Sequence, residues 1–86
     1  MARRPEPVRK TVREVLDDLV AGHRDAACAG PAAARKYLER AIAAQVNLPY
    51  AVRTVAWDLL AEDQALLGDW EACAASVTKA LGHLAD

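Results

Sequence analysis

The chain has 86 residues, a formal net charge of −1 at pH 7 and a hydrophobic share of 53%. A chain of this length forms one small domain that buries only about 60% of the surface its unfolded form exposes, so we expect a thin core. No stretch reaches the ~20 apolar residues that cross a bilayer, and no apolar run follows the first arginines as in a secretory signal. The sequence therefore favours a cytoplasmic protein with no membrane partner.

Alanine supplies much of the hydrophobic share, and the sequence contains one Ile and no Phe. Alanine favours helices and lets them approach closely, but each alanine buries little area. Small domains with a thin core are often completed by oligomerisation, so a homodimer is one arrangement that the composition suggests. The bias toward Ala and Arg also suggests a bacterial or phage origin.

The first six residues are polar and include Pro5, which predicts a disordered basic head at residues 1–6 and a single helical domain over residues 7–86. The first helix has two candidate starts. Pro7 could be its first helical residue, or Thr11 could cap it in a capping box with Glu14. Three- and four-residue steps then place one apolar stripe on this helix, formed by Val12, Val15, Leu16, Leu19, Val20 and His23.

Gly30-Pro31 ends the first helix and opens a second, which we expect to run to about Val46. Asn47-Leu48-Pro49 breaks the helical pattern, because the residue before a proline is pushed out of helical geometry. A third helix follows, from Pro49 or Tyr50 to Leu67. Its expected buried stripe is Val52, Val55, Ala56, Leu59, Leu60 and Leu66.

Gly68 is a suitable end for the third helix, because glycine accepts a left-handed backbone without steric cost. Asp69 is a good N-cap for a fourth helix. The residues expected to face inward on this helix are Trp70, Cys73, Ala74, Val77, Ala80, Leu81 and Leu84. No segment alternates as a strand would, so the sequence predicts an all-α fold of four antiparallel helices.

The run from residue 57 to residue 81 resembles a helical hairpin of the tetratricopeptide repeat family. The residues that carry the resemblance are Trp57, the pair Leu60-Ala61, the hinge Gly68-Asp69-Trp70 and the closing pair Ala80-Leu81. In such a hairpin, Trp57 and Trp70 would fill the ends of the seam between two closely packed helices. A similar spacing of Ala34, Leu38 and Ala41 marks the second helix of a preceding hairpin. A compact four-helix bundle is the alternative architecture.

The resemblance implies that the first helix of the hairpin lines a concave, partner-facing side. The positions that would project there are Val55, Asp58, Glu62, Ala65 and Leu66. Asp58 and Glu62 are four residues apart and share one helix face, so they would attract a basic peptide or helix. The competing interpretation is a solvated acidic stripe.

Arginines near the N-terminus form a second candidate contact, for nucleic acid or for an acidic partner: Arg3, Arg4, Arg9 and Arg13. The competing interpretation is a solvated surface with uneven charge. Nucleic acid is not the expected partner, because the chain is not basic overall and shows no helix-turn-helix signature.

We expect no catalytic residues, no metal site and no cofactor, because the sequence contains no phosphate-binding glycine loop, metalloprotease motif or nucleophile elbow. Cys28 and Cys73 lack metal-ligand spacing and lie among alanines, which favours buried free thiols over a disulfide. The function we expect is a small non-catalytic protein–protein interaction module, acting as an adaptor or regulatory subunit. The alternative is a small inhibitor or antitoxin-like protein, of phage origin, that blocks an enzyme or nucleoprotein complex.

Overall fold

The computed structural model describes residues 10–44 and 48–85, and the side chains among them up to residue 82. It contains four helices: α1 (Val12–Ala27), α2 (Pro31–Ala44), α3 (Tyr50–Leu66) and α4 (Trp70–Ala85). All regular secondary structure in these two ranges is helical, which confirms the all-α prediction. The expected disordered head and the predicted helix end near Val46 lie outside the described residues.

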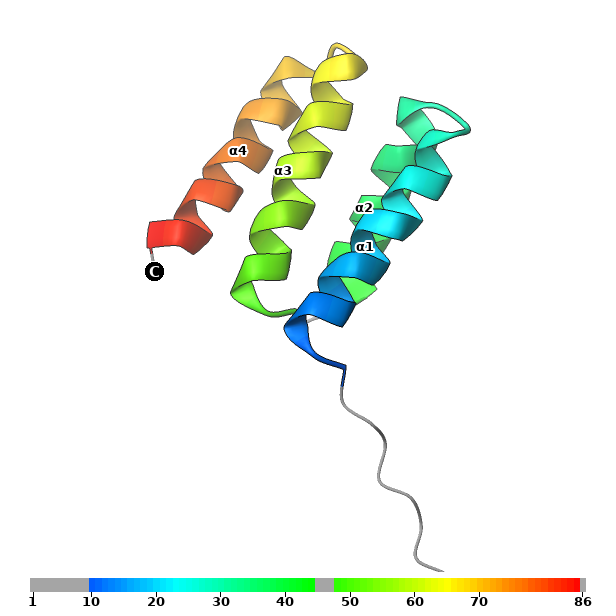
Figure 1. Ribbon diagram of the computed structural model, residues 1–86. Helices are drawn as coiled ribbons and strands as arrows, with labels where there is room; N and C mark the ends of the chain where they lie inside the picture. Colours follow the sequence, from blue (N-terminus) through cyan, green and yellow to red (C-terminus); the bar gives the residue numbers. More distant parts are fainter. Residues whose placement is uncertain (1–9, 45–47, 86) are drawn as a thin grey trace, which may run out of the picture.

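The central element is α3, which packs against α4 on one side and against α1 and α2 on the other (Figure 1). Short loops connect α1 to α2 and α3 to α4, so each of these pairs forms an antiparallel hairpin. Within the described residues, α4 packs against α3 alone. The fourth helix therefore lies at an edge of the molecule with much of its circumference uncovered.

Local sequence explains where the helices begin and end. Thr11 caps α1: its hydroxyl oxygen accepts a hydrogen bond from the backbone N–H of Glu14 at 3.1 Å. The Thr11 hydroxyl in turn lies 3.0 Å from Oε1 of Glu14. This N-cap decides between the two predicted starts in favour of Thr11. Gly68 has a φ of 77°, the left-handed geometry that glycine adopts without strain. Asp69 then caps α4 by accepting from the N–H of Ala72 at 3.2 Å.

The apolar core lies between α1, α2 and α3. The largest fully buried apolar side chains in the described residues are Leu38 of α2 and Val52 of α3. Few bulky side chains support them, so the core is as thin as the composition predicted. The buried cluster consists of Leu19, Leu38, Leu48, Val52, Ala56 and Leu60.

The orientation of α4 differs from the sequence prediction. Trp70, Val77 and Leu81 were expected to face inward, but they are 68%, 39% and 60% exposed. Ala74 is exposed as well, and the side chain of Leu84 lies outside the described residues. Ala80 faces inward as expected, at 5% exposure, and the other buried side chain in the described part of α4 is Ser76, at 2%, which the pattern did not predict. Small side chains let α4 approach α3 closely, and this close contact turns the larger apolar side chains outward.

Trp57, the other tryptophan of the predicted hairpin seam, is half-buried and packs against the core. The Lys79 ammonium of α4 lies 5.9 Å from the centre of its ring, within the distance of a cation–π contact. The expected seam therefore has Trp57 at one end, whereas Trp70 lies in solvent at the other.

A buried hydrogen bond joins the hairpin of α3 and α4. The Ser76 hydroxyl donates to Oε1 of Gln64 at 2.6 Å, and both residues are buried. This bond is a polar contact that fixes α4 against α3.

Ser76→Ala should lower the free energy of unfolding by about 1–2 kcal/mol, because the buried Gln64 amide loses its partner. Urea denaturation measures the loss. The exposed Thr78→Ala is the matched control, and an equal loss there would contradict this explanation.

Candidate functional site

The outward side of α3 carries the five positions that the tetratricopeptide resemblance assigned to partner binding, and we call this surface the α3 face. Asp58, Glu62 and Leu66 are exposed, and the last of these is 74% exposed. Val55 and Ala65 are half-buried beside them. The expectation that Leu66 also belongs to the buried stripe was wrong: in the final turn of α3, Asp63 and Gln64 are buried, whereas Leu66 lies on the exposed side.

The carboxylates of the α3 face are available to a partner. Asp58 and Glu62 form no hydrogen bond or ion pair with the residues that the structure describes. They are one helical turn apart, so their charges add on one side of α3. The third acidic residue of α3, Asp63, differs in both respects, since it is buried and paired.

The buried pair joins α1 to α3. Nε2 of His23 lies 2.7 Å from Oδ2 of Asp63, and the two side chains are 15% and 6% exposed. His23 belongs to the apolar stripe that the sequence predicts for α1, whereas Asp63 is not among the residues that the sequence pattern singled out. Its spacing from Val52, Ala56 and Leu60 places it on the buried side of α3, and that spacing was the signal in the sequence.

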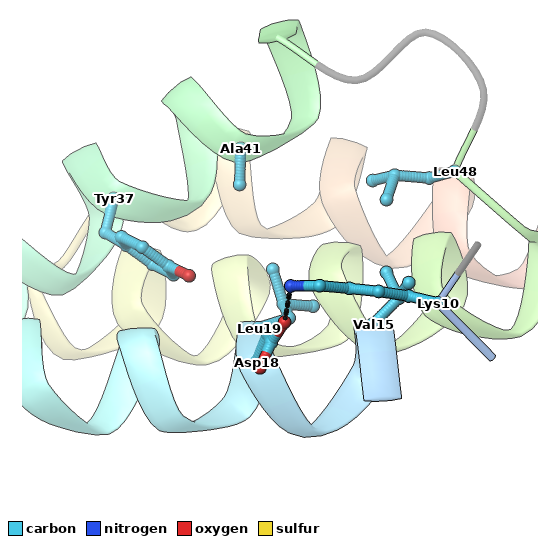
Figure 2. A pocket seen from close by; sticks show the side chains of 7 residues that line it. All are labelled: Lys10, Val15, Asp18, Leu19, Tyr37, Ala41 and Leu48. Carbon is cyan, nitrogen blue, oxygen red and sulfur yellow. Dashed lines mark hydrogen bonds and ion pairs between the residues drawn. The ribbon is translucent and has the colours of Figure 1, made fainter. Parts of the chain in front are cut away.

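A small pocket lies between α1, α2 and Leu48 (Figure 2). Its volume is about 160 Å³, below the roughly 300–1,000 Å³ typical of small-molecule sites. Figure 2 shows Lys10 extending across the pocket to Asp18, with the Tyr37 ring on the opposite side. The remaining lining residues are apolar: Val15, Leu19, Ala41 and Leu48.

The two charged groups of this pocket satisfy each other. Lys10 donates a hydrogen bond to Asp18, and this bond raises the pKa of the Lys10 ammonium above its ordinary value. An ammonium already held by a carboxylate leaves no net charge with which to select an anionic ligand. The pocket therefore gives weaker support for a binding function than the unpaired carboxylates of the α3 face.

The basic candidate contact is only partly described. Arg3, Arg4 and Arg9 lie outside the described residues. Arg13 is exposed on α1, and its Nε lies 4.0 Å from Oδ2 of Asp17 on the next turn. An ion pair this exposed is weak, so Arg13 stays accessible to another charged group.

The cysteines are free, and Cys28 is exposed whereas Cys73 is half-buried. The prediction of free thiols is confirmed, but the expected burial of Cys28 was wrong because it lies in the loop after α1. No group of three or more His, Cys, Asp or Glu within the described ranges could hold a metal ion. Across the same ranges, the helices are too short or too polar to cross a membrane.

Comparison of the chain with protein-family models, with curated proteins and with solved structures found no match. The tetratricopeptide resemblance therefore stays a prediction that rests on the residues of the hairpin. The functional argument depends on the contacts and charges of the molecule itself.

Proposed function

We propose that this chain is a small non-catalytic protein-binding module, and that the α3 face receives a basic segment of another protein. The observation that supports the proposal most directly is the pair of exposed carboxylates, Asp58 and Glu62, which have no partner within the described residues. Neighbouring apolar atoms of Val55, Ala65 and Leu66 offer the contact area that charge alone does not supply.

The charge balance around the α3 face favours a basic partner. From Tyr50 to Gly82 the sequence contains five acidic residues but only two basic ones, Arg53 and Lys79. The Lys79 ammonium is engaged over the ring of Trp57. Complementary charge speeds encounter and excludes wrong partners more than it adds affinity, so we expect modest, salt-sensitive binding.

Charge reversal tests this function. A peptide array would first supply Lys- and Arg-rich helical peptides that bind the wild-type protein. Asp58→Lys/Glu62→Lys should then weaken binding of the best peptide by at least about tenfold in fluorescence anisotropy. Both side chains are exposed, so the fold should remain intact.

The matched control is Asp17→Lys/Asp25→Lys, which makes the same change in net charge on exposed positions of α1. This variant should bind the peptide nearly as well as the wild type. Equal weakening by both double variants would mean that only overall charge matters, and no weakening by the α3 variant would exclude the α3 face as the binding surface.

A further inference from the structure

An uncovered apolar stripe runs along α4, and we call Trp70, Ala74, Val77 and Leu81 the α4 stripe. All four side chains are exposed, Trp70 and Leu81 by more than half. Their steps of four, three and four residues are those of a helix seam that packs against another helix. None of the four residues is charged, so this surface differs from the acidic α3 face.

In α2, apolar side chains with the spacing of the α4 stripe are covered by another helix. Leu38 and Ile42 of α2 have the same four-residue spacing as Val77 and Leu81 of α4. Leu38 is fully buried in the cluster that contains Val52 and Ala56 of α3, and Ile42 packs against that cluster. The corresponding side chains of α4 are exposed, because no helix in the described part of the chain packs on that side.

We propose that a second copy of this chain covers the α4 stripe, with α4 packed antiparallel against its equivalent about a two-fold axis. A two-fold contact uses the same surface on both copies. Antiparallel packing sets Trp70 of one copy opposite Leu81 of the other, and Ala74 opposite Val77. Each larger side chain then meets a smaller one, as interdigitating helices require.

The acidic residues beside the stripe favour this orientation. Asp69 and Glu71 both lie at the N-terminal end of α4. Parallel packing would bring these carboxylates close to those of the second copy. Antiparallel packing separates the two ends by about 16 Å, the length of eleven residues of helix, which is roughly twice the Debye length at physiological ionic strength.

The area of the stripe is consistent with a reversible dimer. A tryptophan buries about 150–250 Å², so the exposed parts of the four side chains offer roughly 400 Å² per copy. With the flanking positions of two sixteen-residue helices, the total approaches the roughly 1,000 Å² at which specific interfaces begin. We therefore expect a dissociation constant in the micromolar range. This dimer does not depend on the proposed role of the α3 face.

Sedimentation equilibrium of the full chain tests the dimer. From about 1 µM to about 1 mM, the wild-type mass should rise from 9.3 kDa toward twice that value. Val77→Lys and Leu81→Lys should each raise the dissociation constant at least about tenfold, because each would bury a charge. Ala75→Lys, at an exposed position of α4 away from the stripe, should leave it nearly unchanged.

A wild-type chain that stays monomeric over this range, or a dimer that survives both stripe variants, would overturn the proposal. Unchanged far-ultraviolet circular dichroism would show that the variants remain folded. If the wild type stays monomeric, the α4 stripe would instead be covered by a different protein or by another segment of a longer chain.

Disulfide trapping tests the orientation, in a background where Cys28 and Cys73 are replaced by alanine. An oxidised mixture of Trp70→Cys and Leu81→Cys chains should yield the mixed dimer. Leu81→Cys alone should yield little. Efficient trapping of Leu81→Cys with itself would contradict antiparallel packing.

Discussion

Replacing Leu38 by alanine is expected to lower the free energy of unfolding by about 3 kcal/mol. Leu38 is 0% exposed and packs in the cluster that joins α2 to α3. A domain of this size is stable by only roughly 5–10 kcal/mol, and few other bulky side chains can close the cavity. The variant should therefore lose a large part of its stability. Urea denaturation followed by far-ultraviolet circular dichroism measures the change.

Leu66→Ala provides the matched control, because it makes the same chemical change at a side chain that is 74% exposed. Its effect on the free energy of unfolding should stay within about 0.5 kcal/mol. Similar losses in both variants would show that helix propensity, and not burial, limits the stability of this chain.

The second large effect is expected for Asp63→Ala, which should lower the free energy of unfolding by about 2 kcal/mol. Asp63 is buried and its carboxylate is bound to the His23 ring. Its removal takes away the link between α1 and α3 and leaves a half-buried imidazole without that partner. Thermal and urea denaturation should show the loss at neutral pH.

The control for Asp63→Ala is Asp58→Ala, because Asp58 is an exposed carboxylate on the same helix. Its effect should be within about 0.5 kcal/mol. In a double-mutant cycle, His23→Ala should cost much less once Asp63 has already been replaced. Additive losses would show that the two residues act independently and would contradict the pair.

Two polar pairs hold the alanine-rich helices in register. His23 and Asp63 join α1 to α3, whereas Gln64 and Ser76 join α3 to α4. Flat surfaces of small side chains can slide past one another with little change in buried area. A buried hydrogen bond opposes such sliding, because any shift would leave its donor or acceptor unsatisfied.

The helix boundaries were readable from short-range chemistry. Thr11 caps α1, one of the two starts that the sequence offered, and Gly68 and Asp69 separate α3 from α4 as predicted. Each of these boundaries depends on a side chain that lies within three or four residues of the backbone group with which it bonds. The amino-acid sequence alone is therefore enough to predict them. That Asp58 and Glu62 share one face of α3 was readable for the same reason, because helical spacing alone determines it.

The inward side of α4 was not readable in this way. The apolar pattern favoured Trp70, Val77 and Leu81 as core residues, but they are exposed; the fold buries Ala80, as predicted, together with Ser76, which was not predicted. Either the side of α4 that carries the α4 stripe or the side that carries Ser76 and Ala80 could have packed against a neighbouring helix. The sequence pattern distinguishes these two sides only by their hydrophobicity. The choice depended on close contact with α3 and on the hydrogen bond from Ser76 to Gln64.

The amino-acid sequence by itself determined four helices, the N-caps of α1 and α4 and the shared face of Asp58 and Glu62 on α3, because each follows from interactions within one or two helical turns. Only the tertiary structure decided that Asp63 lies inside against His23 and that the α4 stripe lies outside. Both outcomes depend on which helix packs against which. Such long-range contacts can outweigh the hydrophobic preference of individual side chains when the helices that meet are lined by alanine and serine.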